Sequence, residues 1–224
     1  MKLPALAGCF GDFTQTRLIA EIASVHGGLT PDGDRDTISR LSETEERYGQ
    51  DVRPRFLAAI LRFADELADD RTRTSEVLRN NGMIPEESEI YHAYSYSLPS
   101  VIIREREVRL SYEMPRSDAV RTYTKRGTQV YLLDEIYSRT RKMHQERLYC
   151  MRFWEYPYAT VDRITVRVEI WKDAPGGTPS KPLKKIEFCL QESGYPSDAG
   201  HECNLCLTNG PELLAGVVLK SELE

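Results

Sequence analysis

Two stretches of helical periodicity dominate the first third of the chain. Apolar residues recur every three or four positions between residues 16 and 26, and two glycines follow directly. This spacing predicts a helix whose apolar stripe includes His26 near its end. A second helix is predicted from about Pro54 to Asp70, because proline suits a first turn and one helix face is apolar. That face consists of Phe56, Leu57, Ile60, Leu61, Ala64, Leu67 and Ala68.

The polar residues of the second predicted helix fall into two groups. At about 3.6 residues per turn, Asp65 borders the apolar face and is expected to be a half-buried carboxylate. Arg62, Glu66 and Asp69 are expected to point away from the core. An ionisable side chain on an apolar face needs a partner, so His26 and Asp65 are the first candidates for a functional site.

The periodicity changes from helical to alternating at about Tyr91. Residues 101–103 and 108–112 alternate around a charged turn, as in two antiparallel strands with one solvated face. Helical spacing returns over residues 129–151, and alternation resumes over residues 161–170. The order strand, strand, helix, strand is typical of a small sheet with a helix on one face.

These patterns predict an α+β protein in two parts. Residues 1–88 are expected to form a helical domain, and residues 89–224 an α/β domain in which a small antiparallel sheet packs with one long helix. Residues 173–182 are rich in turn residues and predict a linker, and residues 186–190 predict an edge strand before a turn-rich tail.

Composition limits the class of protein. With 224 residues and 40% hydrophobic residues the chain can bury a substantial core, and a net charge of −5 argues against wholesale binding of nucleic acid. No apolar run approaches the roughly 20 residues that span a bilayer, and the first residues are too briefly apolar for a secretory signal. Five irregularly spaced cysteines suit reduced thiols. A cytoplasmic protein is therefore expected.

The second predicted helix also carries a family motif. Residues 57–67 (LAAILRFADEL) resemble the closing helix of HD-superfamily metal-dependent phosphohydrolases, in particular the HD-CE-like branch, where such a segment supplies the last metal-binding aspartate. Residues 18–27 (LIAEIASVHG) are similar to the preceding helix of that family, which contains a histidine. The strands after Tyr91 and the helix that begins YLLDEI resemble its accessory sheet. The resemblance covers roughly residues 15–170 and implies the C-terminal half of an HD domain.

The chain departs from the family at the residues that give it its name. No histidine directly precedes an aspartate. The resemblance therefore implies one divalent-metal ligand, Asp65, and an accessory active-site histidine, His26. A metal held by so few protein ligands would be bound weakly. Simpler interpretations remain open, in which a backbone carbonyl satisfies His26 and an arginine pairs with Asp65.

Two further groups of residues are candidates for binding. Cys203 and Cys206 form a C-x-x-C turn that could bind zinc with His201 or Cys189, or they are free thiols. The second group consists of three arginines, Arg104, Arg106 and Arg109, with tyrosines nearby in the sequence. These arginines could hold the phosphates of a nucleotide, or they belong to a solvated strand face that neighbouring glutamates neutralise. P-loop, Rossmann, nucleophile-elbow and zincin motifs are absent from the sequence.

We therefore expect an incomplete or degenerate HD-type subunit. Half of a helical domain leaves apolar helix faces uncovered, so such a subunit would assemble with a partner chain or with a second copy, and it could bind a phosphate-bearing ligand. The first alternative is a metal-dependent phosphohydrolase acting on nucleotides or phosphoesters, whose missing metal ligands come from a partner. The second alternative is a protein interaction module stabilised by zinc.

Overall fold

The computed structural model describes residues 13–27, 29–30, 32–47, 49–154, 160–173, 181–191, 205–207 and 215–224. The chain divides into two compact units. The first combines Met1–Glu66 with Glu146–Thr160, and the second combines Leu67–Gln145 with Val161–Glu224. The boundary predicted near residue 88 falls inside the second unit. Within the described residues, every helix is too short or too polar to cross a membrane.

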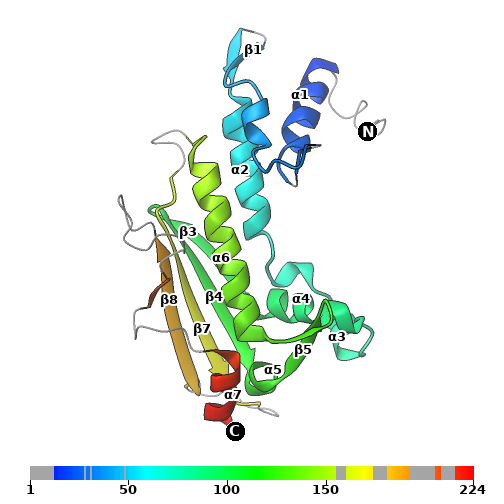
Figure 1. The fold of residues 1–224 in the computed structure, drawn as a ribbon, viewed down its shortest axis with the longest axis vertical. Coiled ribbons are helices and arrows are strands. Elements are labelled where there is room, and N and C mark those ends of the chain that lie inside the picture. Colours follow the sequence, from blue (N-terminus) through cyan, green and yellow to red (C-terminus); the bar gives the residue numbers. More distant parts are fainter. Residues whose placement is uncertain are drawn as a thin grey trace. The chain divides into compact units, whose positions relative to one another are not determined.

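The first unit is mainly helical (Figure 1). Its elements are α1 (Phe13–Ser24), η1 (Ile38–Arg40), β1 (Glu45–Arg47), β2 (Gln50–Val52), α2 (Pro54–Leu67) and the last turns of α6 (Leu132–Met151). The strands β1 and β2 pair antiparallel. Gly49 in their turn has a φ of +72°, which glycine adopts without the steric cost that a Cβ atom would bring.

The helix α1 ends earlier than predicted. The hydroxyl group of its last residue, Ser24, donates a hydrogen bond of 2.8 Å to the carbonyl oxygen of Glu21. Side-chain bonds of this kind compete with the helical ladder, and Gly27 follows closely. His26 therefore lies in a bend after the helix. The prediction that His26 is part of a helical apolar stripe is wrong.

The helix α2 buries the side opposite to the predicted apolar face. Its buried residues are Pro54, Ala58, Ala59, Arg62 and Phe63. Leu57, Ile60 and Leu61 are 42%, 37% and 40% exposed, and Ala64 is also exposed. Residues three and four apart lie on one side of a helix, so these four residues form a continuous stripe, here called the outer stripe. The sequence correctly predicted that α2 has an apolar face. The prediction that this face is the one buried in the core is wrong.

The second unit contains a five-stranded sheet with the order β3-β4-β7-β8-β9 (Figure 1). Its strands are β3 (Ser100–Arg104), β4 (Glu107–Pro115), β7 (Arg163–Trp171), β8 (Lys184–Gln191) and β9 (Leu205–Leu207). Neighbouring strands are antiparallel except β4 and β7, which are parallel because the chain between them returns through α6. The prediction of an antiparallel sheet therefore needs this correction. The predicted edge strand β8 is paired on both sides.

Alternate residues of the two central strands form the core of the second unit. Val108, Leu110, Tyr112, Met114, Ile164, Val166, Val168 and Ile170 are all at most 1% exposed. The helix α6 crosses one face of the sheet (Figure 1). There Tyr137 packs edge-on against Phe188 of β8, with ring centroids 5.1 Å apart. The predicted combination of a small sheet and one long helix is confirmed.

Residues 91–97 are helical, although the sequence predicted that alternation begins at Tyr91. They belong to α4 (Glu86–Ser97), whose first turn carries three glutamates, as the helix dipole favours. The segment predicted as helical from residue 129 begins with a strand, so α6 starts at Leu132. The remaining elements are η2 (Arg71–Arg73), α3 (Glu76–Asn80), α5 (Arg116–Val120), β5 (Thr122–Lys125), β6 (Thr128–Tyr131) and α7 (Gly216–Leu223).

Candidate functional site

His26 and Asp65, the predicted site residues, are each located in the first unit. The Nδ1 atom of His26 forms a short hydrogen bond with the carbonyl oxygen of Ala23. Asp65 is exposed on α2, and no hydrogen bond or ion pair engages it within the described part of the chain. The expectation that Asp65 is half-buried is wrong, because α2 packs through the side that carries Arg62 and Phe63.

The described residues do not by themselves fit a divalent metal ion. They contain no group of three or more histidine, cysteine, aspartate or glutamate side chains with metal-binding geometry. A hard cation such as magnesium takes about six oxygen ligands, so a single carboxylate at Asp65 would leave almost all positions to water. The roles predicted for His26 and Asp65 in a metal site stay predictions.

Arg62 lies at the centre of a buried polar cluster that the sequence analysis missed. Its Nε atom donates to Glu146 Oε2 at 2.6 Å and its Nη2 atom to Glu146 Oε1 at 3.2 Å. Its Nη1 atom donates to the Thr37 hydroxyl at 3.1 Å, and the guanidinium lies 4.4 Å from the ring centroid of Tyr149. Burial alone would lower the pKa of Arg62, but the hydrogen bond and charge of Glu146 outweigh it and raise the pKa.

A second branch of this cluster begins at Tyr149. Its hydroxyl group accepts a hydrogen bond from the Ile38 amide at 3.0 Å and donates one to Asp36 at 2.9 Å. Arg152 also donates to Asp36, at 3.2 Å. These bonds tie the loop before η1 to the end of α6 inside the first unit. The cluster is suited to holding these segments together, because each of its charges already has a partner of opposite sign.

The predicted phosphate-binding arginines lie around the turn between β3 and β4. The side chain of Arg104 is exposed and makes no hydrogen bond or ion pair with the described residues. Arg106 pairs with Asp162 at 2.8 Å, and Arg109 pairs with Glu107 at 2.7 Å. Two of the three charges are therefore compensated, as in the alternative of a solvated strand face. Binding of a phosphate-bearing ligand by these arginines stays a prediction.

The predicted zinc ligands fall mostly outside the described residues. This applies to Cys203, to His201 and to the side chain of Cys206. The backbone of Cys206 belongs to β9, where its pairing partner on β8 is Cys189. Among the described residues, neither Cys189 nor the buried Cys150 forms a disulfide. Zinc binding at Cys203 and Cys206 stays a prediction.

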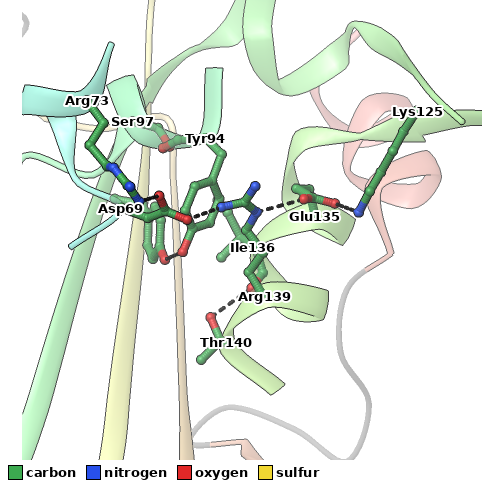
Figure 2. Close-up of polar contacts among 10 residues, drawn as sticks. Asp69, Arg73, Tyr94, Ser97, Lys125, Glu135, Ile136, Arg139 and Thr140 are labelled. Carbon is green, nitrogen blue, oxygen red and sulfur yellow. Dashed lines mark hydrogen bonds and ion pairs between the residues drawn. The ribbon is translucent and has the colours of Figure 1, made fainter. Parts of the chain in front are cut away.

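A charged network in the second unit surrounds Arg139 of α6 (Figure 2). The Nε atom of Arg139 donates to Glu135 at 2.8 Å, and its Nη1 atom donates to Asp69 at 2.5 Å. Asp69 also pairs with Arg73, and Glu135 with Lys125. Burial alone would lower the pKa of Arg139, but the hydrogen bond to Glu135 and the charge of Asp69 raise it. Each carboxylate thus serves two cations.

Two buried tyrosines complete this network. The hydroxyl groups of Tyr94 and Tyr112 are hydrogen-bonded at 2.8 Å, and the guanidinium of Arg139 lies 4.3 Å from the ring centroid of Tyr94 (Figure 2). Burial raises the pKa of Tyr94 to about 12 and holds the pKa of Tyr112 well above its ordinary value. Both hydroxyls therefore stay protonated at neutral pH. The network connects η2 and the segment before it with α4, β4, β5 and α6. It could not be found from the sequence because Asp69 and Arg139 are far apart in the chain.

Comparison with known proteins identifies the family. A family model described as HD-CE matches residues 6–142, which is more than half of the chain. The match includes His26, Asp65 and the network around Arg139. No curated protein and no solved structure matches significantly. The resemblance carried by the LAAILRFADEL segment is thereby confirmed, and the chain belongs to the HD-CE family.

Proposed function

We propose that this chain is a non-hydrolytic HD-CE subunit that works as part of a protein assembly, joined through the outer stripe of α2 to a second copy of itself. The observation that carries the proposal is the exposure of Leu57, Ile60 and Leu61, which are between 37% and 42% exposed. Single exposed apolar residues are normal on a protein surface, but a continuous helical stripe is typical of an interaction surface.

The charges at the two ends of the outer stripe favour a second copy as the occupant. Arg53 directly precedes α2, and Asp65 borders the other end of the stripe; both are exposed. Two α2 helices packed antiparallel would bring Arg53 of each copy to Asp65 of the other. A two-fold interface of this kind uses the same patch on both subunits and is the most common symmetric assembly.

The residues present support a subunit that has no hydrolytic activity of its own. The sequence contains no adjacent His-Asp pair, and the described residues contain no cluster of metal ligands. His26 is engaged by a main-chain carbonyl group of its own segment. Asp65 alone cannot hold a divalent ion against water with useful affinity.

A metal-dependent phosphohydrolase is the second candidate, and the exposure of Asp65 favours it. This carboxylate has no partner among the described residues and borders the outer stripe. A different chain that docks on the stripe could therefore reach Asp65 and supply the missing His-Asp pair. In that case Asp65 would be a metal ligand of the assembly and not an ion-pair partner of Arg53.

Sedimentation velocity over a range of concentrations tests the first proposal. We expect the wild-type chain to form a dimer and Leu61→Asp to weaken dimerisation by at least about tenfold, because a charge would be buried in the interface. Val77→Asp is the matched control, since Val77 is 68% exposed and lies on α3. A wild-type chain that stays monomeric at every concentration contradicts self-assembly.

A charge exchange separates the two candidates. Arg53→Asp and Asp65→Arg should each weaken the dimer, and the double variant should recover most of the loss, because the exchanged charges again meet their opposites. If the chain binds manganese or iron only together with a co-purifying partner, and Asp65→Asn abolishes that binding, the hydrolase candidate is supported and the homodimer is contradicted.

A further inference from the structure

A second binding feature of the first unit lies at the opposite end of α2 from Asp65. A cavity of about 380 Å³ opens between three segments that are distant in the sequence. The segment of η1 and the loop after it, the first turn of α2 and the residues after α6 each contribute side chains. The lining residues are Ser39, Glu43, Arg55, Phe56, Arg152, Phe153 and Trp154. Its volume falls at the lower end of the range for small-molecule sites, about 300–1,000 Å³.

Arg55 supplies a fixed positive charge in this cavity. Its Nε atom donates to the carbonyl oxygen of Leu41 at 2.7 Å, and its Nη2 atom to that of Ser39 at 3.0 Å. These carbonyl groups orient the guanidinium without neutralising it. No carboxylate forms an ion pair with Arg55 among the described residues, and its Nη1 amino group has no partner there. The charge is therefore available to an anion.

Arg152 supplies a second cation at the rim. It donates to Asp36 at 3.2 Å through Nη2, and its side chain remains 55% exposed. Asp36 is shared with the hydroxyl group of Tyr149, which donates to it at 2.9 Å. Among the lining side chains the two arginines stand against one carboxylate, that of Glu43. The lining thus carries a net positive charge, unlike the chain as a whole.

Aromatic rings form the rest of the lining. Phe56, Phe153 and Trp154 come from two different elements, and the ring of Trp154 is supported edge-on by Phe63 with centroids 5.3 Å apart. The indole Nε1 atom of Trp154 is buried and has no hydrogen-bond partner among the described residues. Buried indole N–H groups normally have an acceptor, so this group could serve a ligand seated beside it.

We propose that this cavity binds a nucleoside monophosphate. Flat bases stack on aromatic side chains irrespective of base identity, and arginine forks match the geometry of phosphate oxygens. A nucleoside monophosphate has a base for the aromatic rings and a phosphate for the arginines. Inorganic phosphate can contact only the arginines, and a free nucleoside lacks the phosphate that they would bind. The cavity is too small for a long polynucleotide segment. The cavity shares no lining residue with the outer stripe, although Phe56 lies one helical turn before Ile60 on α2.

Isothermal titration calorimetry of the full chain with AMP tests this proposal. We expect saturable binding of AMP, with adenosine and inorganic phosphate each at least about tenfold weaker. Arg152→Ala should weaken AMP binding by about tenfold to a hundredfold, as for the loss of a hydrogen bond between charged groups. Arg152 is preferred to Arg55 for this test, because its side chain is 55% exposed and Asp36 keeps its bond from Tyr149 when Arg152 is removed, whereas among the described side chains Arg55 alone donates to the carbonyl groups of Ser39 and Leu41.

The control variant is Arg40→Ala. Arg40 is an exposed arginine of the same unit that pairs with Asp32 outside the cavity, so its loss should leave AMP affinity within about twofold. Phe153→Ala should weaken AMP and adenosine but not inorganic phosphate, which separates stacking from charge. The proposal is overturned if AMP shows no saturation up to about 1 mM, if Arg152→Ala and Arg40→Ala bind AMP equally, or if phosphate binds as tightly as AMP.

Discussion

Arg62 of α2 and Glu146 of α6 form a two-bonded ion pair inside the first unit, with nitrogen to oxygen distances of 2.6 and 3.2 Å. Only 8% of the Arg62 side chain and 19% of the Glu146 side chain are exposed. This pair explains how α2 can direct its more polar side inward. A buried arginine is tolerated because a carboxylate, a hydroxyl group and an aromatic face surround it.

Removal of Arg62 should destabilise the first unit strongly. Arg62→Ala leaves Glu146 as an uncompensated, largely buried charge, so we expect the free energy of unfolding to fall by about 3 kcal/mol. Urea unfolding followed by circular dichroism measures this change. Arg17→Ala is the matched control, because Arg17 forms an exposed ion pair with Glu21 whose loss should change little. Equal effects of the two substitutions would contradict the structural role of Arg62.

The network around Arg139 should depend on the guanidinium geometry and not only on charge. Lysine cannot donate to Asp69 and Glu135 at the same time in the planar arrangement of Figure 2. We expect Arg139→Lys to lower the free energy of unfolding by about 2 kcal/mol. Arg104→Lys, the same change at an exposed strand end, should be neutral in the same thermal and urea experiments. A neutral Arg139→Lys would show that charge alone suffices.

Acid should destabilise the second unit through Glu107. The carboxylate accepts hydrogen bonds from the Thr165 hydroxyl at 2.5 Å, from Arg109 at 2.7 Å and from Arg163 at 3.2 Å, and these lower its pKa. Because the folded pKa is below the unfolded value of about 4.3, the stabilisation is present above that pH and is lost as the pH falls through the folded pKa.

Glu107→Gln should therefore flatten the dependence of stability on pH below about 5. The measurement is the free energy of unfolding from urea titrations at a series of pH values between neutrality and the acid transition. Glu105→Gln provides the comparison, because Glu105 is exposed in the adjacent turn. If both variants keep the slope of the wild-type chain, Glu107 does not control the acid response.

Cys150 should be nearly inert in the folded protein. It is fully buried, and burial raises the pKa of its thiol to about 12. Only the thiolate reacts with alkylating agents, so iodoacetamide at pH 8 should modify Cys150 far more slowly than the partly exposed Cys189. Peptide mass spectrometry gives the two rates. Unfolding in urea should make them equal, and equal rates in the folded state would contradict the burial of Cys150.

Local patterns in the sequence were sufficient for most of the second unit. The alternation in β4 and β7, the charged turn between β3 and β4, and the helical spacing of α6 all predicted elements that the fold contains. These predictions succeeded because each of these elements packs one face against the core. The spacing of apolar residues along the sequence therefore shows which side chains are buried. The start of α4 was missed because its tyrosines suit strands as well as helices.

The sequence by itself determined the family, through the LAAILRFADEL segment, and the amphipathic character of α2. Only the tertiary structure decided which side of α2 is buried. The reason is that burial of Arg62 depends on Glu146, a residue 84 positions away that no local period can reveal. The same holds for the cavity beside Arg55, since its rings and charges meet only after three distant segments have folded together.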